Sequence, residues 1–261
     1  MLRIATPISH LFKRQEAAKR IIKHSDCLEC REHDIFQDFE KDKEELFHCD
    51  LEPIHPMKEE EFDFLAKVID KKRNLKLISF HMASSCEKST IKNGMFVPVE
   101  GTKHYEREEM LDLACQNFDR IKRIVGDNMI LCVENNNYYP TESYKYVTNP
   151  DFIYQVVMDN NLMFLLDIAH AKISSHNQGS TYEAYKSKLP LDRLIQIHIC
   201  QYAIDDMDMA YDAHGIPEED TYTEIKQLIT DYKNLKYLTV EYYKDEDNLI
   251  NIIQNLRMLI K

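Results

Sequence analysis

The chain has 261 residues, of which 44% are hydrophobic, and its formal net charge is −12. This length and composition predict one domain over residues 1–261, and the lack of any apolar run of about 18 residues excludes a membrane-spanning helix. The acidic balance argues against a nucleic-acid partner, because affinity for nucleic acid depends on Lys and Arg side chains that neutralise phosphates.

The N-terminus and the cysteines indicate a cytoplasmic protein. The first residues, MLRIATPISHLFKR, contain no long apolar segment, so we expect no signal peptide. The seven cysteines are an odd number and indicate reduced thiols. Cys27 and Cys30 fall on a predicted strand, where residues three apart point to opposite faces, so we interpret them as unrelated thiols. No Gly-rich phosphate loop is present, and no organic cofactor is expected.

Strands and helices alternate along the chain. Lys58–Lys72 carries apolar residues at helical spacing, Gly126 is a typical helix stop, and Asn149-Pro150 is a typical helix start. The third strand follows the charged stretch FEKDKEEL. We predict eight strands with alternating helices: strands at 2–6, 27–30, 47–51 and 75–81 and strands ending at 134, 167, 198 and 241, with helices at 10–24, 58–72, 105–125, from 150 onward and at 245–261.

One connection is unusually long. Met82–Lys103 shows no helical periodicity and carries Gly94 and Gly101 with the apolar trio Met95–Val97. It leaves a predicted strand directly after His81. Long loops of this kind commonly cover active sites or contact substrates, so we predict that this one covers the mouth of the site.

Five of the apolar runs end in a residue that can bind a metal. Parallel strands joined by crossover helices all point the same way, so their last residues converge on one face. In a (β/α)₈ barrel, an α/β fold, that face is the active-site face. The sequence therefore predicts a TIM barrel with a metal site at its C-terminal mouth, and the five residues are His81, Glu134, Asp167, His198 and Glu241.

Two further motifs enlarge this set. In LLDIAHAK, His170 stands three residues after Asp167, which carries a second ligand onto the loop expected there. In YDAHGIP, Asp212 and His214 are two apart, and in an extended segment such residues point the same way. Taken alone, this second pair is more typical of a solvated turn.

Eight ligands are too many for one ion and suit two or three metals that share a bridging carboxylate. The predicted set consists of imidazoles and carboxylates with no strand-end cysteine. Ligands of these types are compatible with Fe, Zn or Mn, and they do not distinguish among these metals.

The ordered pattern H…E…D-x-x-H…H…D-x-H…E resembles the xylose-isomerase-like barrel superfamily. Within it, the chain resembles the multinuclear iron-dependent oxidative enzymes that modify ribosomally made peptides, and more distantly the zinc-dependent endonuclease IV family. The closest segments are CVENNNYY, NPDFIYQVV, LMFLLDIAHAKISSHN and DAHGIPEEDTYTEIKQLI. IATPISHLF, DCLECREHDI and LFHCDL are also similar, although Ile4-Ala5-Thr6-Pro7 stands where the family usually has a glycine-rich strand.

The resemblance implies one more ligand at the end of the third strand. His48 in LFHCDL fits this position, and His55 is the alternative. It also implies how the ligands group around the ions. The first metal is assigned to His48, His81 and Glu134, the second to Glu134, Asp167, His198 and Glu241, and the third to His170, Asp212 and His214.

The resemblance implies O₂-dependent oxidation of a peptide, at a cysteine, by two or three iron ions, with Zn or Mn as alternatives. It also implies a peptide substrate with a separate recognition protein. No catalytic residue beyond the metal centre is assigned. Two other enzyme classes stay open: a zinc-dependent phosphodiester hydrolase and a sugar isomerase or epimerase. A metal-binding subunit without turnover is the non-enzymatic alternative.

Overall fold

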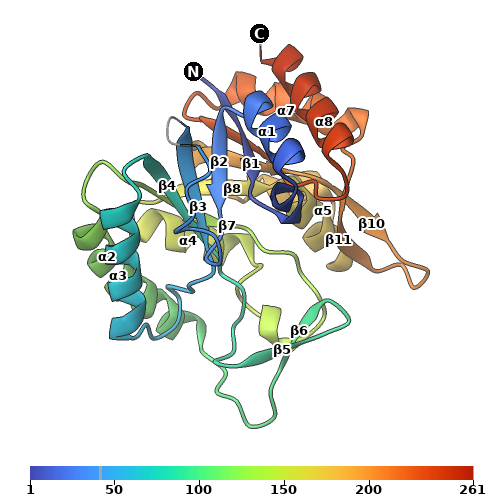
Figure 1. The fold of residues 1–261 in the computed structure, drawn as a ribbon. Helices are drawn as coiled ribbons and strands as arrows, with labels where there is room; N and C mark the ends of the chain where they lie inside the picture. Colours follow the sequence, from blue (N-terminus) through green and yellow to red (C-terminus); the bar gives the residue numbers. More distant parts are fainter. Residues whose placement is uncertain (41–42, 261) are drawn as a thin grey trace.

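The protein forms a closed barrel of eight parallel strands in a computed structural model that describes residues 1–40 and 43–260. The strand order is β1-β12-β9-β8-β7-β4-β3-β2, and helices surround the barrel (Figure 1). The predicted (β/α)₈ fold is therefore confirmed. Among the described residues, no helix is long and apolar enough to cross a membrane.

The barrel strands and the α-helices have the following bounds. The strands are β1 (Arg3–Pro7), β2 (Cys27–Cys30), β3 (Glu44–Cys49), β4 (Leu75–Phe80), β7 (Ile130–Glu134), β8 (Met163–Asp167), β9 (Leu194–Ile199) and β12 (Tyr237–Val240). The helices are α1 (Gln15–His24), α2 (Glu59–Lys71), α3 (Arg107–Val125), α4 (Pro150–Asp159), α5 (Ile168–Asn177), α6 (Tyr182–Lys186), α7 (Glu219–Asp231) and α8 (Glu246–Leu259).

One apolar layer of the barrel interior is built from one buried side chain of each strand. Because side chains alternate along a strand, the residue two positions further on points into the barrel one layer higher. Leu46 is thus followed by His48, Cys132 by Glu134, and Leu165 by Asp167. The apolar layer closes the barrel beneath the polar residues at its mouth, and it consists of Ala5, Cys27, Leu46, Leu77, Cys132, Leu165, Ile195 and Tyr237.

The structure corrects three details of the predicted elements. The segment between β2 and β3 forms turns, with no helix in its described residues 31–40 and 43, so the alternation of strands and helices is wrong there. The third strand begins at Glu44 rather than Phe47, because Glu45 is buried through an ion pair. His10–Lys13 is a short 3₁₀-helix that precedes α1. Lys261, the predicted end of the last helix, lies outside the described residues.

Two β-hairpins extend from the mouth of the barrel. One is β5 (Ser89–Lys92) with β6 (Met95–Pro98), and the other is β10 (Gln201–Ile204) with β11 (Ala210–Gly215). Asn93 and Gly94 both have positive φ and form the two-residue turn of the first hairpin, which is the geometry that Asn-Gly favours. The connection predicted to lack periodicity therefore contains a hairpin, and Figure 1 shows both hairpins projecting away from the chain termini.

A buried cation ties three segments together at the other end of the barrel. The Lys72 ammonium, directly after α2, lies 2.8 Å from Glu45 Oε1 of β3 and donates a 2.7 Å hydrogen bond to the Gln37 carbonyl. Its side chain is only 3% exposed. The pair explains how Glu45 is accommodated in a barrel strand.

Replacing this cation should destabilise the fold. Lys72→Ala leaves the Glu45 carboxylate buried without its partner, and we expect a loss of about 3 kcal/mol in the free energy of unfolding. Lys71→Ala, whose side chain is 62% exposed, is the control and should change stability by about 0.5 kcal/mol or less. Urea denaturation of both variants measures the difference. Equal stabilities would contradict the role of Lys72.

Candidate metal centre

The structure brings the nine sequence-predicted residues together at the barrel mouth. Four are among the last two residues of their barrel strands, and two directly follow a barrel strand. His170 lies in the first turn of α5, not on a loop, because that helix begins directly after Asp167. The pair Asp212 and His214 comes from β11. The nine are His48, His81, Glu134, Asp167, His170, His198, Asp212, His214 and Glu241.

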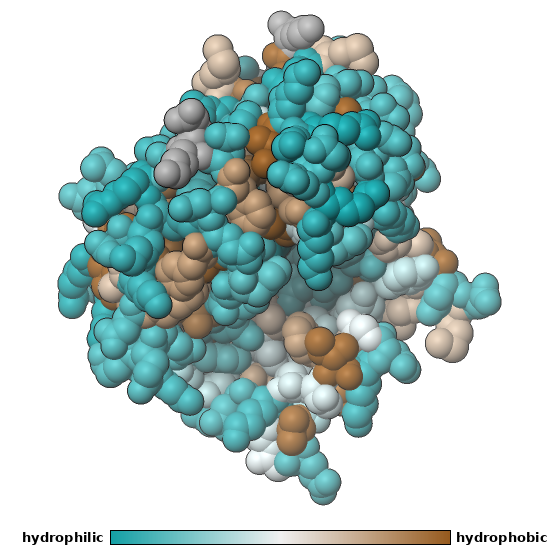
Figure 2. Space-filling model, in the orientation of Figure 1, coloured by the Kyte–Doolittle hydropathy of each residue, from teal (hydrophilic) through white to brown (hydrophobic). Residues whose placement is uncertain are grey.

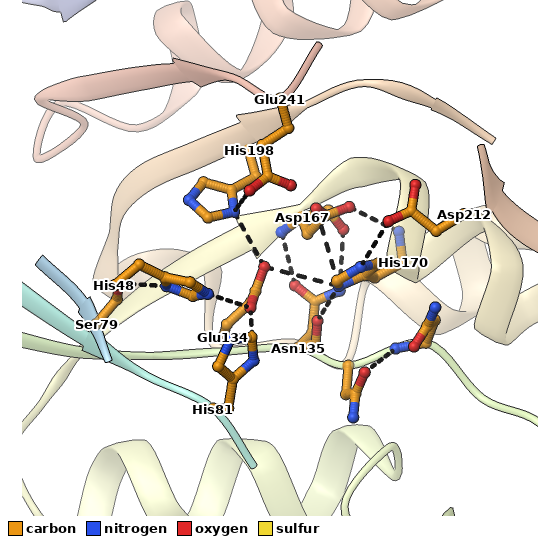
Figure 3. Close-up of polar contacts among 12 residues, drawn as sticks. His48, Ser79, His81, Glu134, Asn135, Asp167, His170, His198, Asp212 and Glu241 are labelled. Carbon is orange, nitrogen blue, oxygen red and sulfur yellow. Dashed lines mark hydrogen bonds and ion pairs between the residues drawn. The ribbon is translucent and has the colours of Figure 1, made fainter. Parts of the chain in front are cut away.

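Glu134 occupies the middle of this cluster (Figure 3). Its Oε2 atom lies 3.3 Å from His48 Nε2 and 3.3 Å from His81 Nδ1. Its Oε1 atom lies 3.1 Å from His198 Nδ1 and 3.6 Å from His170 Nδ1. The side chain is 2% exposed. Each carboxylate oxygen thus faces its own pair of imidazoles, which is the arrangement required of a carboxylate shared by two ions.

The remaining members continue outward from this core. Glu241 Oε1 is 3.4 Å from His198 Nδ1, and its Oε2 is 3.8 Å from His214 Nε2. Asp212 Oδ2 is 3.6 Å from His170 Nε2 and 3.1 Å from His214 Nε2. His214 itself has a positive φ of 42°, a strained conformation for a residue with a side chain.

The donor atoms of the cluster fit a divalent metal. Glu134 Oε2, Asp167 Oδ2 and His198 Nδ1 are buried and make ion-pair contacts but no well-aligned hydrogen bond among the described residues. A buried polar atom without a hydrogen bond costs about 1–3 kcal/mol in stability. Three such atoms in one cluster therefore indicate a site for a bound cation. Two sets of three, His48 with Glu134 and His198, and Glu134 with Asp167 and His170, have donor atoms within 4.8 Å of one another.

Three of the histidines are fixed by contacts outside the cluster. His48 Nδ1 is 2.7 Å from Ser79 Oγ, His170 Nδ1 is 3.0 Å from the Asn135 carbonyl, and His198 Nε2 is 3.1 Å from Glu29 Oε2. In His48 and His198 the other ring nitrogen faces Glu134, and in His170 the other ring nitrogen, Nε2, faces Asp212. Such outer contacts hold metal-binding imidazoles in position in many metalloproteins.

Sequence reasoning missed Glu29 and its partner Arg31. Glu29 is fully buried and accepts hydrogen bonds from Gln196 Nε2 at 2.6 Å and Thr239 Oγ1 at 3.2 Å. Arg31 lies 3.0 Å from Glu29 and 2.5 Å from Glu241. Glu29 could have been found from its spacing: it stands two residues after Cys27 on the same strand, so both side chains point to the same face, which here is the inner face of the barrel.

The carboxyl groups of the cluster differ in their ionisation. Burial opposes the charge on Glu134, but nearby His198 and His170 outweigh it and lower the pKa of Glu134 to about 2. Burial also opposes the charge on Glu241, yet His198 and Arg31 lower its pKa to about 2. Burial raises the pKa of Asp167 to about 7, because His170 offsets it only in part. A cation at Asp167 would therefore displace a proton near neutral pH.

The alternative histidine and the cysteines also have defined places. His55 lies outside the cluster: its Nε2 is 2.8 Å from the Ser84 carbonyl, and its ring packs on Tyr105. Cys27 and Cys30 belong to separate core clusters, in agreement with unrelated thiols. The predicted ligand set contains no strand-end cysteine, but Cys200 directly follows β9, and its Sγ lies close to donor atoms of Asp167 and Glu241. This could have been seen from its spacing of two residues from His198.

A cavity of about 540 Å³ adjoins the cluster at Asp212. Its walls come from the tips of the two hairpins, with Met95 on one side and Met207 and Met209 on the other. Brown atoms in Figure 2 mark exposed hydrophobic residues around the hairpins. Met207 is 84% exposed.

Hydrogen bonds hold both hairpins to the barrel. Asn177, at the end of α5, donates to the Tyr138 and Ala210 carbonyls and accepts from the Ala210 amide. In the other hairpin, the Phe96 amide donates to Tyr144 Oη, and Thr141 Oγ1 donates to the Phe96 carbonyl. The cavity therefore has anchored walls.

Solved structures with a similar fold include sugar epimerases and a structure titled SacUVDE. A D-psicose 3-epimerase crystallised with D-fructose is 12% identical, covers 99% of both chains and has a TM-score of 0.66. A structure titled SacUVDE is 14% identical over 100% of both chains, with a TM-score of 0.53. At such low identity these likenesses show the fold alone.

Curated relatives match part of the chain. A UPF0276 protein of Paraburkholderia phytofirmans is 27% identical over 127 residues, which are 49% of this chain and 39% of the relative. A UPF0276 protein of Caulobacter sp. strain K31 is 23% identical over 139 residues, 52% of this chain and 49% of the relative. The matched part thus spans half or less of the length of these relatives.

The sequence model of one family covers most of the chain. It is described as RiPP precursor modification enzyme MbnB/TglH/ChrH, and it matches residues 47–257. The matched segment contains all nine residues of the cluster. The chain therefore belongs to the MbnB/TglH/ChrH family of RiPP precursor modification enzymes.

Proposed function

We propose that this protein is a multinuclear iron enzyme that uses O₂ to oxidise a ribosomally made peptide at a cysteine. The observation that carries the proposal is the cluster centred on Glu134, whose two oxygens face separate pairs of imidazoles. Family membership supports a peptide as the substrate. The net charge of −12 weighs against the alternative of a phosphodiester hydrolase acting on nucleic acid.

The residues group around three ions in the proposed centre. His48, His81 and Glu134 would hold the first ion. Glu134 and Asp167 would hold the second together with His198 and Glu241. His170, Asp212 and His214 would hold the third. When bound, iron supplies redox chemistry and open positions for two reactants, and holding both reactants makes the reaction intramolecular.

The side chains of the cluster prepare the centre in two ways. The charged forms of Glu134 and Glu241 lower the net charge of bound cations, while Arg31 limits the excess of negative charge. Burial raises the pKa of Asp167 to about 7, so a cation bound there would compete with a proton near neutral pH. We assign no general base to the reaction.

The cavity between the hairpins is the proposed place of the peptide. Asp212 of the cluster lines this cavity, so one side chain of a peptide lying in it would reach the proposed metals. Its methionines offer flexible apolar contacts. We propose that a separate protein contributes to recognition of the rest of the peptide.

Metal identity tests the proposal directly. Protein purified without oxygen should hold at least two metals per chain, mainly iron, with the Mössbauer signature of coupled ions. Coexpression with short peptides encoded near its gene should give an iron-dependent mass change on one peptide. Stoichiometric zinc without iron-dependent activity, or catalytic cleavage of abasic DNA, would contradict the proposal and favour the hydrolase.

Substitutions should separate the roles of Glu134 and His214. Glu134→Ala removes the shared carboxylate and should cost more than one metal equivalent. His214→Ala should cost only the third. His176→Ala is the control, since His176 lies on the same helix as His170 but bonds to the Asp208 carbonyl, and it should keep all metals. Metal analysis measures the losses, and equal small losses from Glu134→Ala and His214→Ala would refute these roles.

The β5–β6 hairpin should contribute to substrate binding. Met95→Glu places a charge in the cavity and should raise KM about tenfold, which corresponds to about 1.4 kcal/mol, with normal metal content. Ile91→Glu on the same hairpin is the control, because Ile91 is 66% exposed and does not line the cavity. Shortening the hairpin should lower both turnover and affinity. Full activity of the shortened protein would show that the hairpin is only structural.

A further inference from the structure

Cys200 lies inside the metal centre rather than beside it. It directly follows β9, two residues after His198, and extended residues two apart point to the same side. The side chain of His198 points into the barrel mouth, so the thiol of Cys200 points there as well, one layer higher. The residue is 2% exposed, and its Sγ lies 3.5 Å from Asp212 Oδ1.

A second observation points to a ligand at this place. Asp167 Oδ2 is completely buried and has no hydrogen-bond partner among the described residues. Asp167, Cys200 and Glu241 each offer a donor atom within 4.8 Å of the others. Within residues 1–40 and 43–260, no other cysteine belongs to such a group. Two carboxylates and a thiol therefore converge where one carboxylate oxygen lacks a partner.

We propose that the thiolate of Cys200 is a further ligand of the centre and binds the ion held by Asp167 and Glu241. The inference deepens the proposed function and rests on it for the presence of a metal. On binding, the S–H bond breaks, a metal–sulfur bond forms, and the proton leaves to solvent, so no electron is transferred. Asp212 then loses its contact with the thiol hydrogen and becomes available to the third ion.

The surroundings explain why the thiolate needs the metal. Without a cation, a charged sulfur would face the carboxylates of Asp167, Asp212 and Glu241, and like charges in a buried site repel strongly. With a divalent cation, the sulfur becomes part of a neutralised site. A thiolate also biases the position toward iron, cobalt or zinc and away from magnesium or calcium.

The absorption spectrum of bound Co²⁺ tests for the proposed bond between the metal and the sulfur of Cys200. Metal-free protein titrated anaerobically with Co²⁺ should develop a near-ultraviolet band from thiolate-to-cobalt charge transfer, in addition to visible bands from the metal. Cys200→Ser should abolish the ultraviolet band and keep the visible ones. Cys49→Ser is the matched control: Cys49 follows His48 by one residue and so points away from the mouth, and this variant should keep both.

A measurement on the unchanged protein covers the case in which the serine variant does not fold. X-ray absorption of the zinc-loaded protein should detect a sulfur atom at about 2.3 Å from the metal. Bound metal without the ultraviolet band or the sulfur shell, or a band that survives Cys200→Ser, would overturn the role of Cys200 and leave the metal centre in place. Failure of the protein to bind any Co²⁺ or Zn²⁺ would instead overturn the metal centre itself.

Discussion

The contact between the Glu134 carboxylate and its surrounding imidazoles is the interaction on which the centre depends. Four histidines from different parts of the barrel lie within 3.6 Å of its two oxygens. A buried carboxylate is unfavourable unless positive charge or hydrogen bonds compensate it. Arg31 and the imidazoles supply part of that compensation. Cations at the remaining free donor atoms would complete it, and this compensation accounts for the burial of Glu29, Glu134 and Asp167 at 2% exposure or less.

The barrel register explains how distant segments reach one point. Asp167 of β8 pairs with His198 of β9, and Thr239 of β12 pairs with the same residue. The ends of neighbouring strands are thereby fixed at the same height. The layer beneath is apolar and filled, so the polar side chains above it can only occupy the mouth of the barrel. A one-residue shift of any strand would turn its ligand to the outer face.

Much of this arrangement could be predicted from the sequence, because an apolar run that ends in His, Asp or Glu can be recognised from the order of residues alone. Glu29 could not be recognised in the same way, since it lies inside a four-residue strand that ends in Cys30. The β5–β6 hairpin was detectable from Asn93-Gly94, but its strands are too short to show alternation clearly. Which nitrogen each histidine offers depends on partners such as Ser79 and Asn135, and these contacts exist only in the folded chain.

Helix α5 has a consequence for communication between the two halves of the site. Its first turn carries His170, and its last residue, Asn177, clamps β11 through Ala210. Ten helical residues span about 15 Å, so this short rigid rod joins the interior of the cluster to the wall of the cavity. A molecule that displaces the β10–β11 hairpin outward must either move α5 or break the hydrogen bonds between Asn177 and Ala210. The wall of the cavity formed by β11 and the position of His170 are thus connected through one helix.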